Sequence, residues 1–357
     1  MASSEVVEPV RRRTWAVPRL SPYFWCLLAL TAALFVSVGL GAVAIPPWTV
    51  MRILLSRLPF VRLTADWPGT WVTILFSIRL PRTALMALTG AALGGSGAAY
   101  QGVFRNPLAD PYLLGIASGA GLGAIAAMTV RWPDSPLSYL AVPAASFLGA
   151  LATVAVVYTL ARVGQTAPTT TLILAGVAVG AFATAITTFL MLRAGEEMRR
   201  AVVWLLGGYA LGGWLPVGAM LPYVGAGLAV LSLLGRPLNV LQFGDEQARQ
   251  MGLNVDRLKL VLILTASLVT AAAVAFSGVI GFLGLVVPHV IRLLWGGDYR
   301  HLTPLAVLGG ATSLVLADIV ARTAIAPQEL PVGVVTALVG APFFLYLLRR
   351  SKQQAYW

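Results

Sequence analysis

The sequence predicts an all-α integral membrane protein with about ten transmembrane helices. Two observations lead to this fold class. First, 58% of the 357 residues are hydrophobic and only 11% are charged, whereas a soluble domain carries about 25% charged residues. Second, the hydrophobic residues form long runs, and a run of roughly 20 mostly apolar residues is enough to cross a bilayer as a helix.

The apolar runs, taken in order, predict ten spans in a single polytopic membrane domain. They cover residues 23–45, 83–104, 112–130, 138–161, 171–192, 215–235, 258–277, 279–295, 303–324 and 333–348. An even number puts both termini on one side, and the excess of Lys and Arg on that side indicates the cytoplasm. The first run is longer than the apolar core of a signal peptide, about 7–15 residues. We therefore interpret it as an uncleaved helix after 22 cytoplasmic residues.

Composition excludes several function classes. The net charge is +12, but the arginines are scattered between apolar runs and form no face for nucleic acid. A phosphate-binding loop needs Gly-Lys-Ser/Thr, and neither Lys259 nor Lys352 has that context. His289 and His301 are the two histidines, too few for a metal site or a catalytic cluster. We expect no catalytic residue, no metal and no covalently bound cofactor, which also disfavours a membrane enzyme.

Two connecting segments have a pattern of their own. Residues 193–214 begin with charged side chains and become rich in Trp and Gly, which predicts a short helix on the outer surface. Residues 236–257 form the longest inner connection, in which Gly244 and Asp245 start a short polar helix and Gly252 ends it. This second helix is either a docking surface or an ordinary amphipathic connector.

Small residues recur every four positions in two spans. Gly176, Gly180 and Thr184 do so in the fifth span, and Gly333 and Ala337 in the tenth. Such stripes allow close helix packing, within the chain or against a second copy. They would equally form a smooth, weakly polar wall for a bulky ligand, and the pattern alone leaves both interpretations open.

Two short segments suggest an internal repeat. Residues 91–97 read Ala-Ala-Leu-Gly-Gly-Ser-Gly and residues 272–278 read Ala-Ala-Val-Ala-Phe-Ser-Gly. In the predicted topology they lie on helices that run in opposite directions, as in the inverted repeats of many transporters. The match is short, so chance similarity is the alternative.

One acidic residue lies inside a predicted span. Asp318 precedes Arg322 by four residues, which places the two on one helix face as a neutralising pair. An ionisable residue within a span can also couple transport to an ion gradient. The second interpretation would make the protein an ion-driven secondary transporter, and it predicts a strong loss of transport when Asp318 becomes Asn.

Long motifs occur in order between about residues 70 and 350. They read RLPR at 79–82, YQGVFRNPLADPYLLG at 100–115, FGDEQARQMG at 243–252, SGVIGFLGLVVPHVIR at 277–292, LADIVAR at 316–322 and ELPVGVVTALVGAPFF at 329–344. The sequence thereby resembles the permease subunits of the type II ABC importers for vitamin B12, heme and ferric siderophores. The resemblance implies ten helices with an inverted repeat, in a bacterial inner membrane.

The resemblance also implies partners and site residues. The family works as a homodimer with two cytoplasmic ATPase subunits, which use the ATP, and a periplasmic binding protein. By position, docking of the binding protein falls to Arg79, Arg82 and Arg322, with lipid headgroup anchoring as the alternative. Coupling to the ATPase falls to Phe243, Gly244, Asp245, Glu246, Ala248, Arg249, Met251 and Gly252.

The expected pathway follows from the same resemblance. Its inner gates are Asn106 with Leu108, and the loop from Gln165 to Thr171, which includes Thr169 and Thr170. The fifth and tenth helices, with the small-residue stripes, line the pathway. Arg193 near the outer end of the fifth helix would attract a carboxylate or anchor in the interface. It favours heme slightly over a ferric siderophore as the cargo, with vitamin B12 as the alternative.

Overall fold

The computed structural model describes residues 21–354, apart from 42, 44, 58, 62, 134–137, 163, 165, 194 and 209–211. The elements within these residues are helices, as the composition predicts. The N-terminal segment expected in the cytoplasm, residues 1–20, and Gln165 of the expected second gate lie outside the described residues.

Each of the ten expected spans corresponds to a helix. They are α1 (Pro22–Gly39), α4 (Leu80–Phe104), α5 (Ile116–Met128), α6 (Ala141–Ala161), α7 (Thr169–Arg193), α9 (Leu215–Leu233), α12 (Val255–Ser277), α13 (Leu283–Trp295), α14 (Tyr299–Thr323) and α15 (Val332–Gln354). In the described part of the chain, seven helical stretches are long and apolar enough to cross a membrane, and the apolar stretches of α5, α13 and α15 are shorter. The ten-helix prediction is confirmed in this sense.

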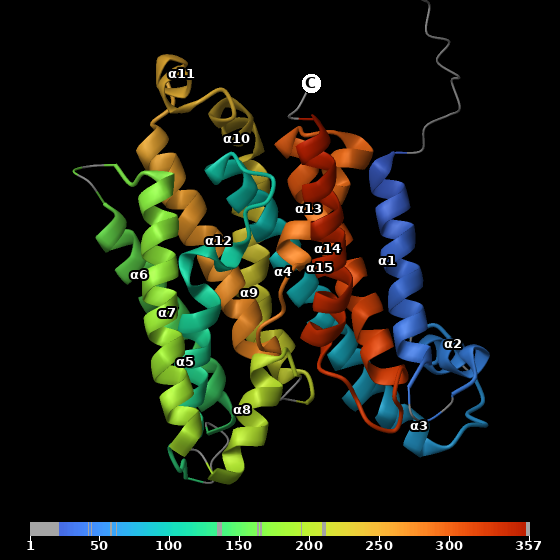
Figure 1. Ribbon diagram of the computed structural model, residues 1–357. Coiled ribbons are helices and arrows are strands. Elements are labelled where there is room, and N and C mark those ends of the chain that lie inside the picture. The colour runs from blue at the N-terminus through green and yellow to red at the C-terminus, as the bar shows by residue number, and fades with distance from the viewer. Residues whose placement is uncertain are drawn as a thin grey trace, which may run out of the picture.

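Shorter helices lie between the long ones. They are α2 (Pro47–Leu55), α3 (Gly69–Thr73), the π-helix η1 (Ile74–Arg79), η2 (Pro111–Leu114), η3 (Ser138–Leu140), η4 (Gly195–Glu197), α8 (Met198–Leu205), α10 (Gly235–Leu241) and α11 (Asp245–Gln250). Figure 1 shows α10 and α11 at the end of the bundle where α15 finishes, and α2, α3 and α8 at the opposite end. We name these the inner end and the outer end.

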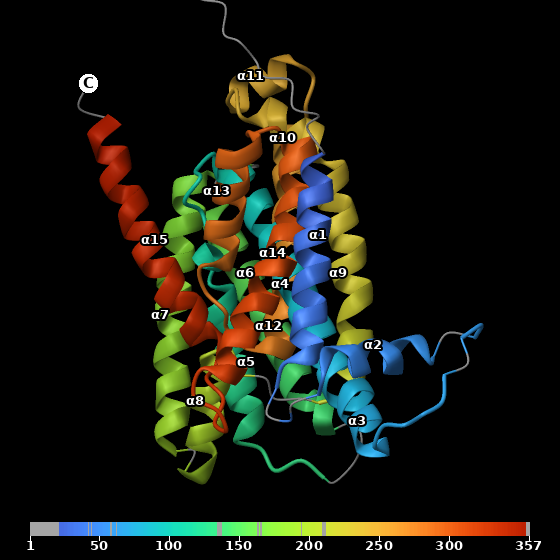
Figure 2. The same ribbon diagram turned by 90° about the vertical axis from the view of Figure 1, so that its right-hand side faces the viewer.

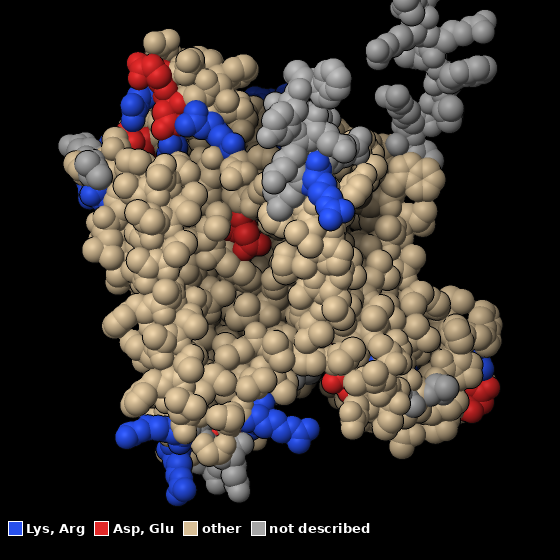
Figure 3. All heavy atoms as spheres, viewed as in Figure 1, with Lys and Arg blue, Asp and Glu red and all other residues tan. Residues whose placement is uncertain are grey.

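Charge is distributed as a membrane protein requires. On the face shown in Figure 3, most Lys, Arg, Asp and Glu atoms gather toward the two ends, with a wide, nearly uncharged band between them. Burying a charge in lipid is costly, so this band is the part of the surface that can face lipid. Exposed apolar side chains on α1, such as Phe24, Leu28 and Phe35, belong to it.

The second span begins earlier than the sequence predicts. The expected start at residue 83 is wrong, because helix runs without a break from Gly69 through α3, η1 and α4 to Phe104. Arg79 and Arg82 lower the hydropathy of residues 69–82, which hides this part of the helix. Their side chains are almost completely buried, so the charge that hides the helix is satisfied inside the protein.

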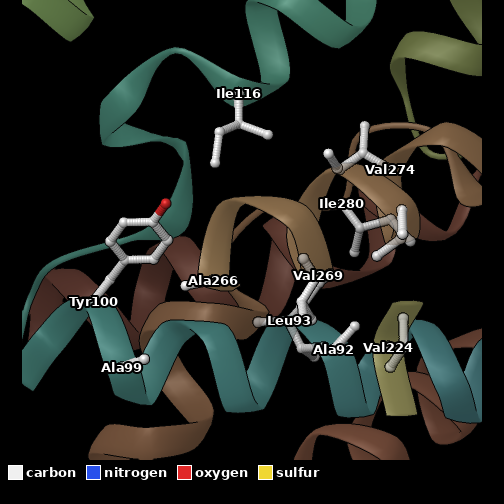
Figure 4. Packing of buried hydrophobic residues seen from close by; sticks show 14 of the residues in the cluster. Ala92, Leu93, Ala99, Tyr100, Ile116, Val224, Ala266, Val269, Val274 and Ile280 are labelled. Atoms are coloured by element: carbon white, nitrogen blue, oxygen red, sulfur yellow. The ribbon is translucent and has the colours of Figure 1, made fainter. Parts of the chain in front are cut away.

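The core forms where α4 passes between its neighbours. Figure 4 shows side chains of α4, α5, α9 and α12 meeting there, with Tyr100 beside Ala266. Tyr100 is buried, and its hydroxyl lies 2.6 Å from the hydroxyl of Ser267 on α12. A buried tyrosine needs such a partner, because an unpaired polar group in an apolar core is costly.

Glycines bring α4 and α14 into backbone contact. A Cβ added at Gly90 would press into the carbonyl of Gly310, and one at Gly94 into the carbonyl of Ala306. These two helices make the most extensive contact in the molecule. Small residues are what permits this approach in the absence of a strong hydrophobic drive between membrane helices.

Replacing Gly90 by valine should therefore destabilise the fold. The side chain has no space, and overpacking costs about 1–3 kcal/mol or more. Thermal unfolding in detergent measures the effect. The matched control is Gly225→Val on α9, where an added Cβ meets nothing within 4 Å. Equal melting temperatures for the two variants would contradict the close contact.

The two halves of the chain repeat an element order in opposite directions. α4 ends at the inner end and is followed by an irregular segment and the short helix α5; α12 begins at the inner end, and an irregular segment and the short helix α13 follow it. The segments 91–97 and 272–278 lie on these antiparallel helices, which pack against each other. The arrangement agrees with the inverted repeat.

Candidate functional site

Five charged side chains gather at the outer end, where η1, α4 and α14 meet the loop before α15. They are Arg79, Arg82, Asp318, Arg322 and Glu329. Asp318 is completely buried, and its Oδ1 lies 2.9 Å from Nη2 of Arg82. Nη1 of the same guanidinium lies 2.7 Å from Oε2 of Glu329, whose side chain is 52% exposed. Arg82 is thus held between one buried and one accessible carboxylate.

Arg322 takes the other side of Asp318. Its Nε lies 2.9 Å from Oδ2 of Asp318, so the pair expected from the four-residue spacing is confirmed. The Nε–H group points to the Asp318 carbonyl oxygen at 3.4 Å, and Oδ2 accepts no aligned hydrogen bond. The contact is therefore an ion pair. A buried carboxylate between two guanidinium groups compensates the charges that burial would otherwise leave unpaired.

Two of these arginines also cap the end of α1. The last carbonyl groups of a helix have no partner within it. Arg79 Nη1 donates to the carbonyls of Val38 and Gly39 at 3.0 and 2.8 Å. Arg322 donates to the carbonyl and the hydroxyl of Ser37 at 3.3 and 2.8 Å. The cluster therefore fastens α1 to α4 and α14.

Replacing Arg79 by methionine should loosen the end of α1. Two carbonyls, of which that of Val38 is buried, lose their donor at about 1–3 kcal/mol each, so exchange should become at least roughly thirtyfold faster. Hydrogen exchange of residues 30–39 measures this. The control is Arg57→Met, because the Arg57 guanidinium lies over the ring of Phe76, 5.1 Å from its centroid. Unchanged exchange in the Arg79 variant would contradict the cap.

The outer arginines had two expected roles, docking of a binding protein and anchoring in lipid headgroups. The side chains of Arg82 and Arg322 are 11% and 7% exposed, so anchoring by extension into lipid headgroups is wrong for them. Docking of a binding protein stays a prediction. An acidic partner that approaches Arg82 would first meet Glu329, because Glu329 occupies the accessible side of that guanidinium.

At the inner end, residues 236–257 contain α10, α11 and the start of α12, so the expected connection ends three residues early, before Val255. Gly244 precedes α11 with a φ of 112° and Gly252 follows it with a φ of 87°, values that favour glycine. Ala248 on α11 is buried against Leu241 and Val255. The helix expected between the two glycines is present, and it is packed against the rest of the inner end.

The outward face of this segment carries apolar side chains in a polar setting. Phe243 is 68% exposed and Met251 is 55% exposed, and Glu246 between them is also exposed. Arg249 pairs with Asp256 at 3.2 Å within the segment. Exposed aromatic and Met side chains rimmed by charge are typical of an interaction surface. This favours the docking interpretation over the plain connector.

The expected inner gate is a tight turn after α4. The side-chain oxygen of Asn106 accepts the amide of Leu108 at 2.9 Å, and its carbonyl accepts the amide of Ala109 at 3.1 Å. Thr169 and Thr170 begin α7. Constriction of a pathway by these residues stays a prediction.

The small-residue stripes pack inside the chain. A Cβ at Gly176 would press into the carbonyl of Leu113, and Gly180 lies against Ser118. Gly333 touches the turn after α8 through its amide, which donates to the Leu206 carbonyl at 3.1 Å. The packing interpretation therefore holds for these glycines, while lining of a pathway stays a prediction, as it does for the exposed Thr184 and the half-buried Ala337.

Beside the stripes, α7 and α15 each expose apolar side chains. Figure 2 shows the two helices along one side of the molecule. Exposed side chains there include Leu174, Phe182, Leu338 and Val339. Arg193 at the end of α7 lies over Phe189 of the same helix, 5.3 Å from the ring centroid. Attraction of a carboxylate by Arg193, and with it the slight preference for heme, stays a prediction.

Sequence reasoning missed three contributors to these sites. Glu329 lies in the ELPVG motif, but no pattern linked it to Arg82. Arg105 and Gln242 lie at the end of α4 and just before α11, where they join these elements through Asp245 and the Gly102 carbonyl. Each is a long-range contact, which local spacing does not reveal.

Comparisons with known proteins agree with this architecture. The model of the FecCD transport family matches residues 28–350. The cobalamin import permease BtuC of Halobacterium salinarum is 44% identical over 352 residues, covering 98% of this chain and 91% of the relative. The hemin transport permease HmuU of Yersinia pestis is 43% identical over 344 residues, covering 94% and 97%.

A solved structure gives the same result for the fold. A metal-chelate type ABC transporter in an inward-facing conformation superposes with a TM-score of 0.77 at 29% identity, covering 92% of this chain and 98% of the other. The resemblance drawn from the motifs is thus confirmed. This chain belongs to the FecCD transport family.

Proposed function

We propose that this chain is the membrane permease of an importer for a bulky metal chelate, and that separate ATPase subunits supply the energy. The observation that carries the proposal is the match of the whole chain to permeases of one family, at 43–44% identity to two relatives. The chain is a permease and not an ATPase, since the family is a membrane component of ABC importers.

We propose a metal-bearing tetrapyrrole or corrin ring as the cargo. The two relatives named for a cargo at 43–44% identity are a cobalamin and a hemin permease, and both cargoes are large, flat metal macrocycles. Neither relative is clearly nearer, so heme and cobalamin are the first two compounds to test. A ferric siderophore is the third.

The proposed complex contains two copies of this chain, two cytoplasmic ATPase subunits and an external binding protein. The exposed apolar side chains that α7 and α15 carry on one side of the molecule support a second copy as one neighbour. The exposed Phe243 and Met251 support the ATPase as the partner of α11. The external binding protein is proposed from the family resemblance; the arginines of the outer cluster are buried, and Glu329 is its accessible member. The membrane is then the cytoplasmic membrane, with both termini inside.

Co-purification and ATP turnover test this proposal. The chain is expressed with a candidate ATPase, reconstituted, and given heme, cobalamin or a ferric siderophore with the matching binding protein. We expect a stable complex whose ATP turnover responds to one binding protein and falls when the exposed Glu246 is reversed in charge. Failure of every candidate ATPase to associate, with uptake driven by an ion gradient, would overturn it.

A further inference from the structure

We propose that the Arg105–Asp245 ion pair transmits movement of α11 to the turn at residues 106–109, and so couples the ATPase to the inner gate. This inference rests on the proposed function, which supplies the ATPase. It assigns roles to Arg105 and Gln242 that neither the motifs nor the fold gave them.

The geometry of Asp245 carries the first step. Asp245 is the first residue of α11, and its Oδ2 lies 2.5 Å from Nζ of Lys259 on α12. Its Oδ1 lies 3.4 Å from Nη2 of Arg105. That oxygen is enclosed by the protein and accepts no aligned hydrogen bond. Oδ2 of Asp245 is thus paired with Lys259 on α12. Oδ1 faces Arg105 without an aligned hydrogen bond.

Arg105 connects this carboxylate to the gate turn. It ends α4 in the left-handed region, with a φ of 50°, which a non-glycine residue rarely adopts. The next residue is Asn106, whose amide donates to the Gln101 carbonyl at 3.1 Å and whose side chain holds Leu108. A pull on Arg105 therefore acts on the residue from which the turn starts.

Gln242 joins the end of α10 to the last turn of α4. Its Nε2 donates to the carbonyl of Gly102 in the last turn of α4 and to the carbonyl of Leu238 on α10, both at 3.0 Å. The segment that carries the exposed Phe243 is thus bonded to α4 on both sides of that residue. Gln242 thus holds the end of α10 on α4, and movement of α11 itself reaches the end of α4 through the Arg105–Asp245 pair.

The ion pair is suited to a contact that changes during a cycle. The side chains of Arg105 and Asp245 are 40% and 34% exposed, and pairs with that exposure are weak. A shift of α11 toward α4 would complete the hydrogen bond to Oδ1, and a shift away would release Arg105. The alternative is a static surface pair that only stabilises the inner end.

A labelled reporter separates these two roles. The full chain carries Cys26→Ala, so that Leu108→Cys is the single thiol, and is assembled with its ATPase in nanodiscs. The rate of maleimide labelling at position 108 is measured without nucleotide and with a non-hydrolysable ATP analogue. In this parent protein we expect the analogue to change the rate at least severalfold. Loss of thermal stability is followed in parallel.

Arg105→Gln is then expected to remove the response. Labelling with the analogue should fall within twofold of labelling without it, while ATP hydrolysis continues and the melting temperature is retained. The conservative variant Arg105→Lys should keep most of the response, since it retains a positive charge opposite Asp245. The control Arg300→Gln removes an inner-end arginine that pairs with Asp298 on its own turn, and should respond as the parent does.

The outcomes are distinct. A full nucleotide response in Arg105→Gln, or loss of the response in Arg105→Lys, would overturn the inference and leave the proposed function intact. A parent protein with no ATPase association and no response would overturn the proposed function, and the inference with it. These variants are needed because the proximity of Arg105 to the turn does not by itself establish coupling between α11 and the gate.

Discussion

Replacing Asp318 by asparagine should sharply lower the stability of the protein. The loss comes from the buried ion pairs and does not depend on transport of an ion. The carboxylate is completely buried between Arg82 and Arg322, and the amide would leave two guanidinium groups facing each other. Removing one member of a buried ion pair costs about 3–5 kcal/mol. The melting temperature in detergent and the yield of monodisperse protein measure the loss.

The control is Asp66→Asn, which removes the exposed partner of Arg52. Its melting temperature should match that of the parent. The experiment also decides between the two interpretations of Asp318. A stable Asp318→Asn protein that has lost uptake driven by an ion gradient would contradict the structural role and support a secondary transporter.

Replacing Phe243 by aspartate should weaken association with the ATPase. The side chain is 68% exposed, so the substitution leaves the fold intact and removes an aromatic anchor from the proposed interface. Central anchors of this kind contribute 2 kcal/mol or more, roughly thirtyfold in the dissociation constant. Association of the reconstituted permease with the purified ATPase, followed by surface plasmon resonance, measures the change.

Phe60→Asp is the matched control, since Phe60 is 96% exposed and lies in the segment between α2 and α3. It adds the same charge and should leave the dissociation constant unchanged. If Phe243→Asp binds the ATPase as tightly as the parent does, the outward face of α11 is not the docking surface.

The sequence predicts the helices well because lipid imposes length and hydropathy on them. Its one large error in the helices, the start of the second span, has the same physical origin. Arg79 and Arg82 read as polar loop residues, whereas the structure satisfies them with α1 carbonyls, Asp318 and Glu329. A hydropathy scale scores the charge of a side chain, but it takes no account of the partner that makes burial of that charge tolerable.

In the candidate sites, too, the local features could be predicted from the sequence and the long-range contacts could not. The turn glycines Gly244 and Gly252 could be identified because positive φ is a local requirement. The i,i+4 pair of Asp318 and Arg322 could be identified because helix spacing is local as well. The links from Arg105 to Asp245 and from Arg82 to Glu329 join residues more than a hundred positions apart, and a single sequence does not encode them in any short pattern.

The most direct test of the central claim is uptake into proteoliposomes. The permease, its ATPase and the binding protein are reconstituted, and heme or cobalamin movement is followed with and without ATP in the compartment that contains the ATPase. We expect uptake that requires ATP, the binding protein and this chain together, and that persists when ion gradients are collapsed. Uptake that proceeds without ATP and stops with the ion gradient would contradict the proposed importer.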